Sequence, residues 1–169
     1  MHMCDKHINK MTVESWQLLS AAIYRHDPDL HAEWYAAGLL SKVGESTRGW
    51  VNGPFAVWAA ASRENWLWLH EHAAALSDEH WYRWGQHHGR PHATGLKLSQ
   101  IRELAEAIPP GPLTPFATPE GFTPEVASTN ASVAAYRLLY IVDKSRFALW
   151  ERGRPAPAWY TLGRSAYSV

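Results

Sequence analysis

Apolar positions recur with helical spacing along most of this chain. The first stretch contains neither glycine nor proline, and its apolar side chains are spread around most of the circumference, as is typical of a buried helix. Pro28 and Pro54 suit the first turn of a helix, and Asp27 supplies an N-cap for the first of these. Gly85 and Gly89 should end the third helix. The predicted helices have the approximate bounds 3–25, 27–42, 54–84, 98–108 and 128–152.

Three segments between and after these helices carry loop signals. Residues 44–54 hold three glycines and one proline, and residues 109–124 hold six prolines and two glycines, so both should be irregular. Residues 153–169 form a tail rich in glycine, proline and aromatic side chains. Only two short segments have strand-like composition: 50–51 and 140–142. The chain is therefore predicted to be all-α, a compact single-domain helical bundle (residues 1–169) with a Pro-rich loop and an aromatic C-terminal tail.

Composition limits the classes of function. The 169 residues fit one compact domain, and 16 Lys and Arg balance 16 Asp and Glu. A formal net charge of zero excludes a strongly basic whole-molecule footprint for nucleic acid, although a local basic patch stays compatible with it. Cys4 is the single cysteine, so the chain cannot form an internal disulfide. Long apolar runs and a signal-peptide pattern are both missing, which predicts a cytoplasmic protein with no membrane partner.

The first predicted helix carries ionisable groups among apolar neighbours. At roughly 100° per residue, His7 and Glu14 lie within about 20° of each other, and Lys10 and Gln17 border them. A carboxylate in this setting can acquire the raised pKa that a general base needs. Two other interpretations stay open: the carboxylate is paired with Lys10 or His7, or the stripe is a solvated face.

Two later helices carry comparable polar stripes. One face of the long helix is lined by Trp58, Ser62, Asn65, Leu69, His72, Leu76, Glu79 and Arg83. Trp66 and Trp68 flank this face, and on the last helix Arg137 and Lys144 align, with Tyr140 alongside. A single polar stripe of this kind more often has a structural role than a functional one. A helical bundle can, however, combine three such stripes into one polar pocket with aromatic walls. Such a pocket would gather His7, Glu14, Asn65, Arg83 and Arg137 at one cavity.

The ten histidines do not form a recognised metal-binding pattern. His70 and His72 lie about 200° apart on a helix and cannot chelate one ion together. No ligand motif joins the histidines near the helix end, which are His80, His87, His88 and His92. Glycine-rich phosphate-binding motifs are missing as well. Neither a metal nor a cofactor is therefore expected, and Cys4 is interpreted as a buried thiol rather than a nucleophile.

The opening of the chain carries a specific motif. It reads Cys4-Asp5-Lys6-His7-Ile8-Asn9-Lys10-Met11 and is followed by Glu14, Gln17 and Leu18. This segment resembles a widespread phage protein family of unassigned role, whose members read like C-D-K-H-x-x-K-M-x-x-E-x-x-Q-L-L. The likeness continues over nearly the whole chain, at Pro54, Trp58, Asn65-Trp66, Trp68-Leu69, Glu79, Arg83, Leu113-Thr114-Pro115-Phe116, Ala135-Tyr136-Arg137, Tyr140, Lys144, Trp150 and Trp159-Tyr160.

That phage family in turn resembles the pyrimidine-dimer DNA glycosylases of the endonuclease V type. Those enzymes carry D-x-H on their first long helix and a catalytic Glu seven residues later, and Asp5, His7 and Glu14 match in identity and spacing. The residues that match the W-Y and G-[KR]-x-x-Y patterns of their tail are Trp159-Tyr160, Gly163-Arg164 and Tyr167. The arginines with which those enzymes grip phosphates are replaced here by Val13 and Gln17.

The resemblance implies an all-α domain in which Glu14 acts at the sugar C1′ during base excision. It also implies that His7 helps to hold the DNA or the sugar and that Trp159-Tyr160 contact the lesion strand. Those enzymes use the α-amine of a small N-terminal residue as nucleophile, whereas this chain begins Met1-His2. Lys10, one turn before Glu14, is the nearby amine that could replace it, and a salt bridge is its alternative role.

The leading prediction is a DNA glycosylase-like protein that acts on a flipped damaged or modified pyrimidine, with AP-lyase activity if an amine takes part. Its partner would be DNA or a nucleotide, and its location the host cytoplasm if the chain is phage-encoded. The catalytic residues are predicted to be Glu14, His7 and Lys10. The substrate-binding residues are predicted to be Asn65, Arg83, Arg137, Tyr140, Lys144, Trp159 and Tyr160.

Two other classes of function are compatible with the sequence. A non-enzymatic protein could use the same pocket to sequester a nucleotide or a modified base. Zero net charge favours this alternative, because a surface that grips DNA usually carries excess Lys and Arg. A virion or interaction protein could instead use its ten tryptophans as a partner surface, which would require a contiguous exposed patch.

Overall fold

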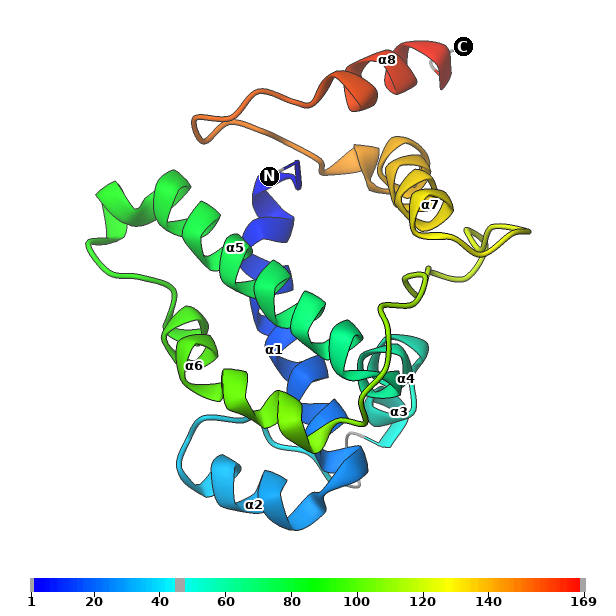
Figure 1. Ribbon diagram of the computed structural model, residues 1–169. Helices are drawn as coiled ribbons and strands as arrows, with labels where there is room; N and C mark the ends of the chain where they lie inside the picture. The colour runs from blue at the N-terminus through cyan, green and yellow to red at the C-terminus, as the bar shows by residue number, and fades with distance from the viewer. Residues whose placement is uncertain (1, 45–47, 168–169) are drawn as a thin grey trace.

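A computed structural model describes residues 2–44 and 48–167, and over these ranges the chain is all-α without strands, which confirms the predicted fold class. The elements in chain order are α1 (Asp5–His26), α2 (Pro28–Ala36), α3 (Arg48–Val51), α4 (Pro54–Ala61), α5 (Arg63–His88), α6 (Ala93–Ile101), the 3₁₀ helix η2 (Arg102–Ala107), α7 (Thr129–Val142), the 3₁₀ helix η3 (Lys144–Arg146) and α8 (Ala158–Tyr167). Figure 1 shows α1 and α5 running past each other through the body of the molecule, where they make the most extensive helix–helix contact.

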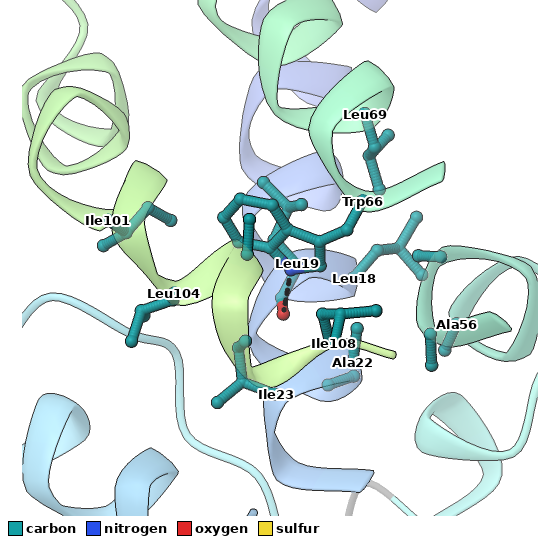
Figure 2. Close-up of a cluster of buried hydrophobic side chains, with 14 of the residues drawn as sticks. Leu18, Leu19, Ala22, Ile23, Ala56, Trp66, Leu69, Ile101, Leu104 and Ile108 are labelled. Carbon is teal, nitrogen blue, oxygen red and sulfur yellow. Dashed lines mark hydrogen bonds between the residues drawn. The ribbon is translucent and has the colours of Figure 1, made fainter. Parts of the chain in front are cut away.

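The hydrophobic core is built around α1, as its apolar circumference predicted. Leu19 and Ile23 of α1 are fully buried and belong to a cluster with residues of α4, α5, α6 and η2. Figure 2 shows the indole of Trp66 lying within this cluster, and its N–H donates to the carbonyl oxygen of Leu19 at 3.3 Å. Trp66 is fully buried and therefore stabilises the core through its buried area.

The long helix predicted over 54–84 is instead two helices, and the break falls at Ser62. This residue is extended (φ −155°, ψ 154°), and its Oγ accepts from the N–H of Asn65 at 3.2 Å as the N-cap of α5. The same hydroxyl donates to the carbonyl oxygen of Pro112 at 2.8 Å, so a contact with the Pro-rich loop fixes the break. At its other end α5 continues past Gly85 to His88, and Gly89 (φ 62°) forms its left-handed C-cap.

Other helix bounds also differ from the prediction. The start of α2 is confirmed, because the Asp27 side chain accepts from the N–H of Leu30 at 2.8 Å, but the helix ends at Ala36 rather than near 42. The helix predicted at 98–108 begins earlier and finishes as a 3₁₀ helix, and the one predicted at 128–152 ends at Val142. Residues 109–119 are irregular, as predicted. The segments with strand-like composition, 50–51 and 140–142, are helical.

Part of the C-terminal tail forms a helix, α8 (Ala158–Tyr167), which the glycine and proline content of the tail did not predict. Helix α8 packs on α7, and at Gly163 a Cβ atom would lie 2.3 Å from Cδ1 of Ile141, so the close approach of the two helices requires glycine. We refer to α7, η3 and α8 (residues 129–167) as the C-terminal unit. Figure 1 shows this unit beside the first turns of α1, away from α2 and η2. None of the helices in the described ranges is both long and apolar enough to span a bilayer.

Candidate functional site

The first turns of α1 meet the C-terminal unit at a set of aromatic side chains, which we call the aromatic cluster: Tyr140, Phe147, Trp150, Trp159 and Tyr160. These rings surround the buried side chains of Cys4 and Ala148. Backbone bonds fix the junction, since the N–H of Asp5 donates to the carbonyl oxygen of Leu149 at 2.9 Å. The interpretation of Cys4 as a buried thiol is confirmed, because its side chain is fully covered.

His7 is joined directly to Tyr140 at this junction. Nδ1 of His7 lies 2.5 Å from the phenol oxygen, and the two rings meet edge to face with centroids 5.2 Å apart. Burial lowers the pKa of His7 to about 4, with the positive charges of Lys10, Lys144 and Lys6 acting in the same direction and Glu14 opposing them. Burial also raises the pKa of Tyr140. Both groups are therefore neutral near pH 7, and the pair can donate to or accept from a polar ligand.

Glu14 lies on the same face of α1 as His7 and is ion-paired. Its Oε1 is 2.8 Å from Nζ of Lys10, and the Glu14 side chain keeps 25% of its surface exposed. The charge of Glu14 acts on the His7 ring. The sequence left open whether this carboxylate is paired with Lys10 or His7 or lies on a solvated face, and in the structure it is paired with Lys10. An accessible carboxylate, an amine and a neutral imidazole thus share one face, and together they can move protons.

The remaining predicted residues of the C-terminal unit gather around Tyr140. The ring of Trp159 stands perpendicular to that of Tyr140, with centroids 6.0 Å apart, and Tyr160 lies against Trp159 at 5.9 Å. The guanidinium of Arg137 lies over the Trp159 ring at 5.8 Å, and Lys144 pairs with Asp143 at 2.5 Å. The indole N–H of Trp159 is buried without an acceptor among the described residues. An unsatisfied buried donor is costly, so this group would gain from an acceptor on a ligand.

Arg83 lies close to this set but does not face a ligand, so its assignment to substrate binding is corrected. Its side chain is buried, with Nη1 2.8 Å from a carboxylate oxygen of Asp5 and Nη2 2.8 Å from Glu79. Arg154 binds the same Glu79 through two hydrogen bonds of 2.9 and 3.0 Å. Burial acts to raise the pKa of Glu79, but the hydrogen bonds from Arg154 and Arg83 bring it below its ordinary value. We call these four residues the ion network; sequence reasoning missed Asp5 and Arg154 in this role.

Asn65 lies elsewhere, so its predicted place in the same cavity is wrong. It stands about five helical turns before Arg83 on α5 and is fully buried. Its amide donates to the carbonyl oxygen of Trp58 at 2.8 Å and to the hydroxyl of Thr114 at 2.9 Å, and its Oδ1 accepts from the N–H of Thr114 at 2.8 Å. Asn65 therefore holds the Pro-rich loop against α4 and α5.

The tryptophans divide between several environments. Trp58 and Trp68 pack with Phe116 of the Pro-rich loop, where a groove of about 270 Å³ opens. That groove is lined by Pro54, Pro115, Phe116, Ala117, Thr118, Thr123, Pro124, Ala127 and Ser132, and by none of the predicted site residues. Of the ten tryptophans, Trp50 and Trp81 are exposed, and they lie on separate helices. Their separation in the chain gives no support to a contiguous tryptophan patch as a partner surface.

The histidines form no candidate metal centre within the described ranges, where no group of three His, Cys, Asp or Glu side chains is arranged to hold an ion. His70 instead binds the carbonyl oxygen of Leu98 through Nε2 at 2.8 Å, and His72 stacks on Trp68. The side chains of His87 and His88 lie outside the described part of the chain.

Comparison of the chain with family models, with curated proteins and with solved structures finds no match. The class of protein is therefore argued from the site itself. Five of the ten predicted site residues are joined by direct contacts, and these are His7, Tyr140, Arg137, Trp159 and Tyr160. Glu14 pairs with Lys10, and the charges of Glu14, Lys10 and Lys144 act on His7.

Proposed function

We propose that the surface formed by α1 and the C-terminal unit binds a pyrimidine base and cleaves its bond to the sugar, as a DNA glycosylase does. The observation that carries this proposal is the contact between His7 and Tyr140, because it joins the Glu14 face of α1 to the aromatic rings of α8. An extruded base stacks on aromatic side chains, and the reacting sugar requires a polar group nearby. The spacing of Asp5, His7 and Glu14 supports the same class of reaction.

We assign Glu14 to catalysis at C1′, the sugar carbon that is bonded to the base. In hydrolysis, the bond between C1′ and the base nitrogen breaks and a water oxygen bonds to C1′. The proton that the water gives up passes through the Glu14 carboxylate to the departing base. The same carboxylate stabilises the positive charge that develops on the sugar in the transition state. His7 is neutral near pH 7 and hydrogen-bonds to the sugar.

Lys10 gives the site an amine that can take the place of water. Its Nζ lies 2.8 Å from Glu14, so the carboxylate can accept the ammonium proton. The neutral amine then adds to C1′ as the base leaves, and opening of the sugar gives a Schiff base that allows strand cleavage. Borohydride traps such an intermediate covalently. Trapping on the parent protein and its loss in Lys10→Gln would support this route, whereas trapping that survives Lys10→Gln would contradict it.

An excision assay tests the assignment of Glu14. Duplexes that carry thymine dimers or hypermodified pyrimidines are incubated with the parent, with Glu14→Gln, and with Glu33→Gln, which alters an exposed carboxylate on α2. Glu14→Gln should lower the excision rate about a hundredfold or more, because general acid–base groups contribute about that much. Glu33→Gln should match the parent. Equal product from the parent and Glu14→Gln would refute the role of Glu14.

A second candidate function is sequestration of a free nucleotide or modified base without chemistry. The pairing of Glu14 with Lys10 favours it, because the carboxylate is already engaged by a cation of its own helix. Calorimetric titration with thymidine monophosphate separates the two functions. Tight binding of the mononucleotide, without excision and without salt-dependent binding to duplex DNA, would support sequestration. A steep salt dependence on duplex DNA would support the glycosylase.

A further inference from the structure

The ring of Phe147 contacts two cations that no predicted site included. Nζ of Lys6, from the first turns of α1, is 4.7 Å from the ring centroid, and the guanidinium carbon of Arg146, from η3, is 5.9 Å from it. The same ring meets His7 with centroids 5.4 Å apart. Two positive side chains from distant parts of the sequence are thus anchored on one ring, directly beside the proposed base site.

The surroundings of these cations are positively charged. Three lysines act electrostatically on His7, and they are Lys6, Lys10 and Lys144. A fourth cation, Arg146, lies over the Phe147 ring that contacts His7. The two carboxylates among them are already paired, Glu14 with Lys10 at 2.8 Å and Asp143 with Lys144 at 2.5 Å. Lys6 and Arg146 form no ion pair within the described residues. Within this group of six side chains the net charge is positive, although the whole chain is neutral.

We infer that Lys6 and Arg146, held on the Phe147 ring, form a subsite for a phosphate group of a nucleotide or of a DNA strand. This inference rests on the proposed function, since it supplies the anion-binding part of the same base site. Both residues are exposed, so a ligand can reach them. A guanidinium binds two phosphate oxygens at once, and an ammonium adds a point charge. The ring orients both groups before a ligand arrives, which lowers the entropy lost on binding.

The subsite also places phosphate-binding side chains at positions of the chain other than those that the resembling glycosylases use. The arginines that the resembling glycosylases use for this purpose are replaced here by Val13 and Gln17. Lys6 lies seven residues before Val13, which is about two turns of the same helix, so the two positions share nearly the same face of α1. A zero net charge is therefore compatible with binding a phosphate at one local site.

The double variant Lys6→Gln/Arg146→Gln tests the inference. Its affinity for a short fluorescein-labelled oligothymidylate is measured by anisotropy over a series of salt concentrations. The dissociation constant should rise about tenfold or more, because two charge-assisted contacts are lost. The slope of log K against log salt should become shallower by about 0.7 for each phosphate released. The matched control is Lys42→Gln/Arg90→Gln, which removes the same charge from two exposed loop positions.

Calorimetry with thymidine monophosphate and thymidine distinguishes a free nucleotide from a DNA strand as the source of the phosphate. Weaker binding of both the monophosphate and the oligonucleotide by the double variant would assign the subsite to a free nucleotide as well as to a strand. Weaker binding of the oligonucleotide alone would assign it to a strand. An equal loss of affinity in the Lys42→Gln/Arg90→Gln control, or no loss in either variant, would overturn the inference.

Failure of the inference can be distinguished from failure of the proposed function, because the binding probes are undamaged and need no chemistry. Glu33→Gln, which lies outside the site, should bind the oligothymidylate as the parent does. If excision is never observed but the double variant binds less tightly, the phosphate subsite stands and the glycosylase proposal falls. If excision depends on Glu14 but the double variant binds as the parent does, the subsite is refuted and the glycosylase proposal stands.

Discussion

At the scale of single residues, the burial of His7 determines its protonation state and therefore the chemistry that it can perform. Its ring is half-buried and contacts both Tyr140 and Phe147, and burial together with three neighbouring lysines disfavours its protonation. A neutral imidazole is the form that can both donate and accept, and its contact with Tyr140 uses one of its two nitrogens. The protein thus keeps His7 neutral over a range in which an exposed histidine would become charged.

This state of His7 makes stability depend on pH. The folded pKa of about 4 is below the ordinary value of 6.5, so the unfolded chain binds the proton first as pH falls. Because His7 favours the folded state only while it is neutral, its contribution to stability should be complete above pH 6.5 and should be lost as pH falls from 6.5 to 4. The pKa of His72 is also lowered to about 4 by burial and contributes in the same window.

Urea unfolding at pH 7 and pH 5 checks this expectation. The parent should lose stability between the two values, and His7→Gln and His72→Gln should each lose less between them. The double variant should have the flattest dependence. An unchanged pH dependence in His7→Gln would show that the folded state does not disfavour protonation of this ring.

At the scale of elements, local signals and tertiary contacts set different helix ends. Asp27 and Pro28 determine the start of α2 by themselves, because the cap and the first turn lie within four residues, and this start could be predicted from the sequence. The break at Ser62 could not be predicted, because its hydroxyl is held by Pro112, fifty positions later. Helix α8 was missed for a similar reason, since Gly163 suggests a loop until Ile141 of α7 packs against it.

The Asn65 side chain joins α4 to the Pro-rich loop. Asn65→Ala would leave the carbonyl oxygen of Trp58 and the N–H of Thr114 without partners, so the free energy of unfolding should fall by about 3 kcal/mol. Asn130→Ala, at an exposed position near the start of α7, is the matched control and should change stability little. Chemical denaturation measures both. A comparable small effect in the two variants would contradict the role assigned to Asn65.

At the scale of the whole molecule, a well-packed body carries a C-terminal unit through two connections. Cys4, Tyr140 and the surrounding rings form the apolar connection, and the ion network forms the polar one. The sequence could predict the members of the site that share a helix face, such as His7 and Glu14, because helical spacing is local. It could not predict that Arg83 meets Asp5, or that Arg154 meets Glu79, because these pairs are joined only by the folded arrangement.

The ion network should therefore govern how firmly the C-terminal unit is held. Glu79→Gln removes the carboxylate shared by Arg83 and Arg154, leaving Arg83 buried with Asp5 as its remaining acidic partner. Amide hydrogen exchange in residues 150–167 should become about tenfold faster or more, while the buried turns of α1 keep their protection. Glu71→Gln, which alters an exposed pair at 3.6 Å on the same helix, should leave exchange unchanged. Uniform acceleration across the chain would mean that Glu79 stabilises the fold as a whole rather than the attachment of this unit to α1 and α5.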